Sequence, residues 1–145
     1  MDENMVLEAR NQAGNYFREG YNCAETIFLT FRPQVAPELD EDMLKIFTGF
    51  GGGLGQSGCT CGALVGSVMM LNLLKGRTNK DGSRKPSYEA AHKFHDIFKE
   101  QFKSTCCRTL NRNPFGTPEH HKTCLKITGT TAKLLAEFLQ EEELV

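Results

Sequence analysis

Residues 46–74, IFTGFGGGLGQSGCTCGALVGSVMMLNLL, form the longest stretch of the chain without a charged residue. The first half of this stretch is rich in glycine, and the second half is apolar and predicts a buried helix. Cys61 stands at the junction and begins the motif CGALVG. Because the free N–H groups at a helix start favour a thiolate, this position predicts a cysteine with a lowered pKa and a chemical role.

The length of the chain, 145 residues, suits one hydrophobic core, so we expect a single domain over residues 1–145. The net charge is −1, which argues against a nucleic-acid-binding protein with a basic face. The acidic start, Met1-Asp2-Glu3, lacks the charge order of a signal peptide. Leu64–Leu74 is nearer in length to a core helix than to a membrane span. We therefore expect a soluble, cytoplasmic protein that does not insert into membranes.

Apolar residues recur at intervals of three and four, which predicts an all-α fold. Asn22 and Glu25 have the spacing of a capping box, so Cys23 should be the first residue of a helix. We expect a single-domain bundle of five to seven helices with a buried glycine-rich loop. The expected helices cover about residues 3–19, 23–32 (ending before Pro33), a short segment after Asp40, 61–74, a segment after residue 86, a turn at Cys106-Cys107, and 120–142.

Apolar stripes predict which face of the later helices is buried. On the fifth helix the stripe consists of Tyr88, Ala91, Phe94, Phe98 and Phe102. On the last helix it includes Cys124, which should therefore face the core.

The chain contains six cysteines, an unusual number for its length: Cys23, Cys59, Cys61, Cys106, Cys107 and Cys124. Without a signal peptide, this number favours metal binding or redox chemistry over a disulfide framework. Neither a pair of CxxC knuckles nor a CxxCH motif is present, so a zinc ribbon and a c-type haem are not expected. Four of the cysteines come from separate segments near predicted helix ends, which a bundle can bring together at one pole.

These residues resemble the C_GCAxxG_C_C family of redox-active proteins, whose members have one early cysteine, a CGAxxG motif and two later cysteines. The matching residues are Cys23 in GYNCAE, Cys61 in CGALVG, Cys107 in STCCR, and Cys124. The resemblance spans essentially the whole chain and implies redox activity. The related module of split-Soret cytochromes implies an iron–sulfur site held by cysteines. Cys59 and Cys106 depart from the pattern, so the ligand at those two points stays open.

Three chemistries suit four thiols from four segments. They can hold a [2Fe–2S] cluster or a zinc ion, or they can cycle between dithiol and disulfide, with Cys61 or Cys23 as the attacking thiol. The alternative is that each cysteine is a small apolar core residue with no chemical role. For Cys124 this alternative is as well supported as a functional role. The leading hypothesis is an iron–sulfur centre for electron transfer or redox sensing. A thiol–disulfide oxidoreductase and a zinc-stabilised interaction domain are the alternatives, with Cys59 and Cys106 as accessory candidates.

Other motifs carry less weight. Gly53-x-Gly55-x-x-Gly58 matches a dinucleotide fingerprint, but the segment before it reads as a helix instead of a strand. Glu89-x-x-His92 has the spacing of half a di-iron carboxylate site, and no second half is visible. His120 and His121 adjoin a loop and are expected at the surface. We expect a redox partner protein and no nucleic acid, and the chain could also pair as a homodimer.

Overall fold

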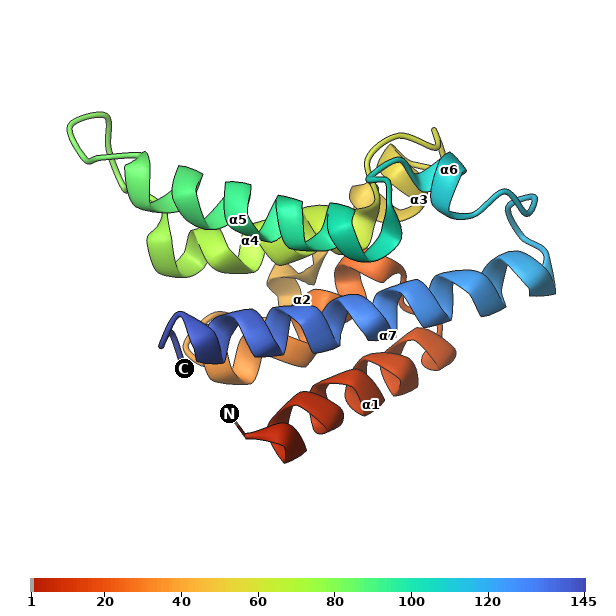
Figure 1. Ribbon diagram of the computed structural model, residues 1–145, viewed down its shortest axis with the longest axis horizontal. Helices are drawn as coiled ribbons and strands as arrows, with labels where there is room; N and C mark the ends of the chain where they lie inside the picture. Colours follow the sequence, from red (N-terminus) through yellow and green to blue (C-terminus); the bar gives the residue numbers. More distant parts are fainter. Residues whose placement is uncertain (1) are drawn as a thin grey trace.

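Seven α-helices and two short 3₁₀ segments make up residues 2–145, the part of the chain that the computed structural model describes (Figure 1). The α-helices are α1 (Glu3–Glu19), α2 (Cys23–Val35), α3 (Gly51–Leu54), α4 (Gly62–Lys75), α5 (Lys85–Phe102), α6 (Cys107–Leu110) and α7 (Pro118–Glu141). The 3₁₀ segments are η1 (Glu41–Ile46) and η2 (Thr48–Phe50). The predicted all-α class is confirmed. No helix within residues 2–145 has the length and apolar character needed to cross a bilayer.

The start of α2 follows the predicted capping box. The Asn22 side chain accepts the Glu25 N–H at 2.9 Å, and the Glu25 carboxylate accepts the Asn22 N–H at 3.0 Å. The same two side chains bind Thr48: its hydroxyl donates to Glu25 at 2.8 Å, and its C=O accepts from Asn22 at 2.9 Å. The cap that makes Cys23 the first residue of α2 therefore also ties the segment before the glycine-rich loop to α2.

α5 begins at Lys85 and not after residue 86, and the boundaries of α2 and α7 differ from the prediction for local reasons. α2 continues through Pro33 to Val35, because the proline lies in the last turn and the Arg32 C=O still accepts an N–H, that of Ala36, at 2.9 Å. α7 begins two residues earlier than expected. The Thr117 hydroxyl caps it by accepting the His120 N–H at 3.2 Å, and a proline occupies the first helical position, which suits a residue without an N–H.

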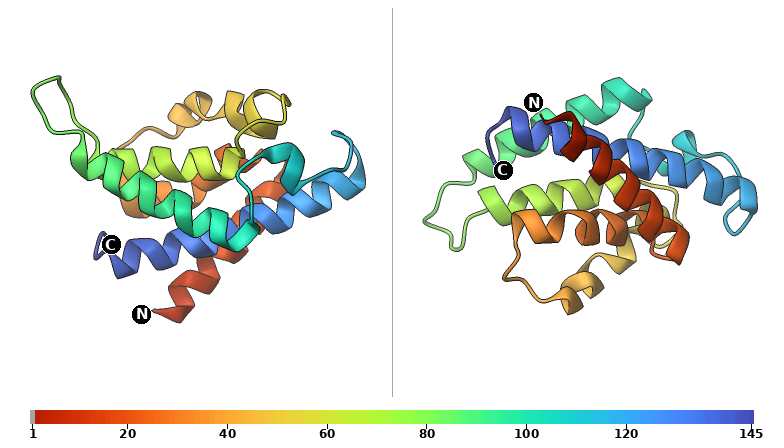
Figure 2. Two further views of the ribbon diagram at one scale, coloured as in Figure 1. Left: turned by 45° about the horizontal axis from the view of Figure 1, so that its top comes forward. Right: turned by 90° about the horizontal axis from the view of Figure 1, so that it is seen from below.

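The core lies between α2, α4, α5 and α7, and α1 packs along α7 (Figures 1 and 2). Its largest fully buried side chains include Phe28, Phe31, Phe94, Phe98 and Leu135. The predicted stripe of α5 is confirmed at its centre, but Tyr88 is 61% exposed. Tyr88 lies in the first turn of the helix on the solvent side, where the Arg84 guanidinium stands 5.8 Å from the centre of its ring.

The start of α4 lies close against α2, as the glycines of the motif predict. A Cβ atom at Gly66 would stand 3.1 Å from the backbone oxygen of Ala24. That is tighter than ordinary van der Waals contact, so glycine sets the spacing of the two helices.

One end of the bundle collects the ends of several helices. α2, α4 and α7 all begin there and α5 ends there, with α3 and α6 beside them, whereas the loop between α4 and α5 lies at the opposite end (Figures 1 and 2). The glycine-rich loop is buried at Gly53 and Gly58, and its tip, residues 54–57, is exposed. This end of the bundle therefore holds Cys23 and Cys107, which begin helices, and Cys61 and Cys106, which directly precede helices.

Candidate functional site

Cys23, Cys61, Cys107 and Cys124 line one small cavity at this end of the bundle. The cavity has a volume of about 20 Å³, room for one water molecule. Cys23, Cys61 and Cys107 are buried and Cys124 is half-buried, and none of them forms a disulfide within residues 2–145. Three helix starts and the second turn of α7, far apart in the sequence, thus deliver their thiols to one place.

A short antiparallel pairing fixes two of these cysteines relative to each other. Residues 58–61 lie beside residues 105–108, with a bridge between Thr60 and Cys106. The Cys61 N–H donates to the Thr105 carbonyl at 2.8 Å, and the Cys107 N–H donates to the Cys59 carbonyl. Sequence periodicity gave no sign of this contact, because it joins single residues about 45 positions apart and not two strands.

Two glycines make room for the cysteines. Gly53 has a left-handed backbone with φ of +67°, and a Cβ there would lie 2.5 Å from the Cys59 nitrogen and 2.7 Å from the Cys107 Cβ. A Cβ at Gly62 would lie 2.6 Å from the Cys23 sulfur. The glycine that follows Cys61 in the motif therefore leaves the space that the Cys23 side chain occupies.

Hydrogen-bond donors surround the sulfurs. The backbone N–H groups of Gly52 and Ala63 interact with Cys23, and those of Ala63 and Leu64 interact with Cys61. The Asn111 amide donates to the Cys124 sulfur at 3.1 Å. Each of these donors favours a negatively charged sulfur.

Burial nonetheless decides the acidity of the thiols. Burial raises the pKa of Cys23 and Cys61 and outweighs the N–H groups that lower it. Burial and the neighbouring Cys23 raise the pKa of Cys107, and burial raises the pKa of Cys124 to about 11. The lowered pKa expected for Cys61 is therefore wrong in direction, because the helix-start effect is present but the loss of hydration is larger.

Two polar side chains of the cavity were not found from the sequence. Thr128 lines the cavity, and its buried hydroxyl has no hydrogen-bond partner among residues 2–145. Asn111 is buried and, besides Cys124, donates to the His120 carbonyl at 2.9 Å. Nothing in their local sequence signals these contacts, since both depend on how α6 and α7 come together.

Cys59 and Cys106 lie outside the cavity. Cys59 is exposed and Cys106 is half-buried, with its sulfur 3.2 Å from the Gly58 carbonyl oxygen. The side chain and backbone of Thr109 lower the pKa of Cys106. The vicinal pair Cys106-Cys107 is thus divided: one thiol faces the cavity, and the other faces outward with the more acidic character.

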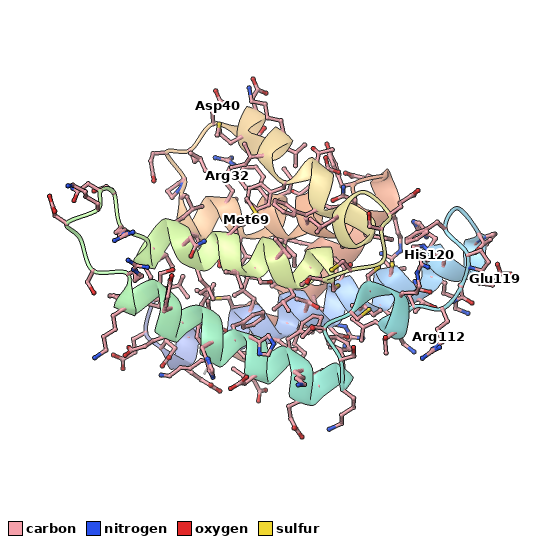
Figure 3. The ribbon with its side chains drawn as sticks, turned by 90° about the horizontal axis from the view of Figure 1, so that it is seen from above. Arg32, Asp40, Met69, Arg112, Glu119 and His120 are labelled. Atoms are coloured by element: carbon pink, nitrogen blue, oxygen red, sulfur yellow. The ribbon has the colours of Figure 1, made fainter. Side chains whose placement is uncertain are left out.

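His120 is half-buried and not at the surface as predicted. Because α7 begins early, His120 lies one turn before Cys124 on the same side of the helix, with its Nε2 3.8 Å from the Cys124 sulfur. Its ring packs on Phe115, with 4.8 Å between the ring centres, at the α7 end visible in Figure 3. An open groove of about 310 Å³ passes this pair and reaches Cys23 and Cys124. His121 is exposed, as expected.

The weaker motifs do not build sites. The glycines of the dinucleotide fingerprint follow a 3₁₀ segment, and residues 2–145 contain no strand that could begin a βαβ unit. Glu89, His92 and His95 are exposed on α5, where both histidines pair with Asp96. Across the described residues, no group of three or more His, Cys, Asp or Glu side chains stands in an arrangement that could hold a metal ion.

Comparisons with known proteins agree with the cysteine pattern. The family model described as "Putative redox-active protein (C_GCAxxG_C_C)" matches residues 21–138, which include all six cysteines. An "Uncharacterized protein" of Archaeoglobus fulgidus is 26% identical over 145 residues, which cover 94% of this chain and 96% of the relative. No solved structure gives a significant match. On the extent of the family match, the chain belongs to the C_GCAxxG_C_C family of redox-active proteins.

Proposed function

We propose that this protein transfers electrons or senses redox state through an iron–sulfur centre held by Cys23, Cys61, Cys107 and Cys124. The observation that carries the proposal is the convergence of four largely buried thiols on one cavity whose walls supply hydrogen-bond donors to sulfur. Cysteine thiolates are the usual ligands of iron–sulfur centres, and such donors tune their reduction potentials.

The acidity of the thiols favours a metal centre over a nucleophilic thiol. A thiol must ionise to attack a disulfide, and burial holds the pKa of Cys23 and Cys61 above the ordinary value. Metal coordination deprotonates a thiol outright and removes this cost. The N–H groups around the two sulfurs then stabilise the charge that coordination creates.

The polar groups of the cavity fit the same centre. The Thr128 hydroxyl has no partner within residues 2–145 and can donate to a ligand sulfur or to an inorganic sulfide. The Asn111 amide already donates to Cys124. If the cavity bound nothing, the Thr128 hydroxyl would stay without a hydrogen-bond partner, which costs about 1–3 kcal/mol.

Binding the centre requires rearrangement of the cysteine side chains. The cavity of about 20 Å³ is small, and the thiols do not stand in a metal-holding arrangement. The centre, when bound, would supply one-electron chemistry. The protein's part is to provide the four ligands, exclude water by burying Cys23 and Cys61, and donate hydrogen bonds through Asn111 and Thr128.

Thiol–disulfide exchange is the second candidate, and Cys106 is the observation that favours it. Cys106 is the accessible thiol with the lowered pKa, and it directly precedes the cavity residue Cys107. In this scheme the Cys106 thiolate attacks a partner's disulfide, releasing one partner thiolate. A second thiol of the chain then displaces the other partner sulfur, leaving an intramolecular disulfide and a reduced partner.

Anaerobic purification followed by iron, sulfide and zinc analysis separates the candidates. The proposal predicts coloured protein with iron and acid-labile sulfide, both lost in Cys61→Ser and retained in the matched control Cys59→Ser. Stoichiometric zinc without a redox response would replace the proposal with a zinc-stabilised domain. Metal-free protein whose electron uptake is lost in Cys106→Ser would establish the exchange mechanism instead.

A further inference from the structure

A groove of about 920 Å³ runs between α1 and α7, on the two helices that lie side by side in Figures 1 and 2. Four basic side chains line it: Arg10 and Arg18 from α1, and Lys122 and Lys126 from α7. No Asp or Glu is among the residues that line it.

The four basic side chains have no acidic partner of their own. Within residues 2–145, none of them forms an ion pair with a carboxylate, whereas Arg32, Lys85, Lys93, Lys103 and Lys133 each do. The whole chain has a net charge of −1, so this groove is a local concentration of positive charge on a weakly acidic protein. Such an uneven distribution orients an approaching molecule that carries complementary charge.

The groove also has apolar residues among those that line it. Leu7, which is 54% exposed, and the half-buried Leu125 both line it. Gly129 also lines it, and an added Cβ there would lie 3.7 Å from the Arg10 side chain, so the two helices are close at this point. Apolar contacts inside a ring of charges are typical of a protein–protein interface, whereas a nucleic-acid face is broadly basic on a basic domain.

A chain of hydrogen bonds joins the groove to the cysteine cavity. Thr123 lines the groove, and its hydroxyl accepts from the Asn113 amide at 3.2 Å. The same amide donates to the Asn111 side-chain oxygen at 3.1 Å, and Asn111 donates to the Cys124 sulfur at 3.1 Å. Thr123, which lines the groove, and Cys124, which lines the cavity, are also neighbours in the sequence of α7.

We propose that the groove between α1 and α7 docks the acidic surface of a redox partner protein and places it beside Cys124. The position beside Cys124 rests on the proposed redox function, whereas the docking of an acidic protein surface rests on the charge and shape of the groove alone. The partner is expected to offer carboxylates around an apolar centre, the complement of the groove.

Binding of a fluorescein-labelled peptide of alternating glutamate and leucine tests the docking surface at low salt. Lys122→Glu/Lys126→Glu should raise the dissociation constant about tenfold or more, because two attractive charges become repulsive. The matched control, Lys45→Glu/Lys80→Glu, makes the same charge change at exposed lysines outside the groove and should leave binding nearly unchanged. Equal loss in both variants, or binding of a short DNA or of anionic lipid vesicles in place of the peptide, would overturn the proposal.

The rate at which the reduced protein is oxidised tests the position beside Cys124. In Lys122→Glu/Lys126→Glu, oxidation by the anion hexacyanoferrate(III) should slow and oxidation by the cation hexaamminecobalt(III) should quicken, relative to the control variant. Unchanged rates in a redox-active protein would show that electrons leave elsewhere. A protein with no redox response at all refutes the proposed function, and the peptide measurement still decides the docking surface.

Discussion

Gly62→Ala tests the close packing on which the cysteine cavity depends. The added Cβ would lie 2.5 Å from the Phe50 carbonyl oxygen and 2.6 Å from the Cys23 sulfur. The Phe50 carbonyl is part of the backbone of η2, so this contact cannot be relieved by rotating a side chain. Cys23 is held at the capped start of α2. The substitution must therefore shift α4 away from the segment before the glycine-rich loop.

The expected cost follows from two opposing effects. Overpacking a close-packed core costs about 1–3 kcal/mol, and a rigid backbone neighbour places this site toward the upper value. Replacing glycine by alanine in a helix returns up to about 1 kcal/mol, and less at the first helical position, which Gly62 occupies. The variant should therefore lose about 2–3 kcal/mol of unfolding free energy.

Gly129→Ala is the matched control, because Gly129 is also a buried glycine of a helix, α7, but an added Cβ there would make only ordinary van der Waals contact, 3.7 Å from Arg10. It should be neutral or should gain up to about 1 kcal/mol. Urea denaturation followed by far-ultraviolet circular dichroism measures both variants. If Gly62→Ala were as stable as the unchanged protein, the contact with Phe50 would not exist in solution. Loss of iron from Gly62→Ala, with Gly129→Ala unaffected, would further show that the spacing serves the cavity.

Three further outcomes are expected. In the metal-free protein, Cys124 should account for up to roughly 2 kcal/mol of the unfolding free energy lost as pH rises from about 9 to about 11, because its thiol ionises near 9 when unfolded but only near 11 when folded; urea titrations should therefore show a shallower slope for Cys124→Ser than for the unchanged protein, and an equal slope would contradict this. Cys61→Ser should reduce the iron content more than any other single Cys→Ser change, and Cys59→Ser should be mild; the reverse order would make Cys59 the ligand. Iodoacetamide at neutral pH should alkylate Cys106 well before Cys61, as mass spectrometry of peptides would show; equally fast alkylation of Cys61 would contradict its burial.

Much of the fold could be predicted because its signals are local. The spacing of apolar residues and the cap at Asn22 depend on residues within one or two turns, and the helix bounds of α1 and the start of α2 agree with the structure. The boundaries that were wrong depended on a competing local contact. The Thr117 cap of α7 replaced the expected start, and Pro33 was tolerated because only the last turn follows it.

The site was less predictable because its chemistry depends on the environment of each thiol. A helix start at Cys61 implies donors, and the donors are present, but the burial that reverses their effect arises from α2, α6 and α7 together. The inward turn of His120 depends on a cap three residues away. The roles of Thr128 and Asn111 depend on contacts between elements that no local pattern encodes.

Burial makes the cavity thiols poor nucleophiles, and it separates them chemically from the cysteines outside the cavity. If the donors alone stabilised the thiolates, the site would need no metal. If the surroundings were fully apolar, the donors found around Cys23, Cys61 and Cys124 would be missing. Thiols that are costly to ionise, placed among groups that favour their ionised form, suit a state in which an added cation supplies the missing stabilisation. Cys106, outside the cavity, has the opposite balance of weak burial and a lowered pKa. One chain thus presents an inner set of thiols suited to holding a centre and an outer thiol suited to exchange.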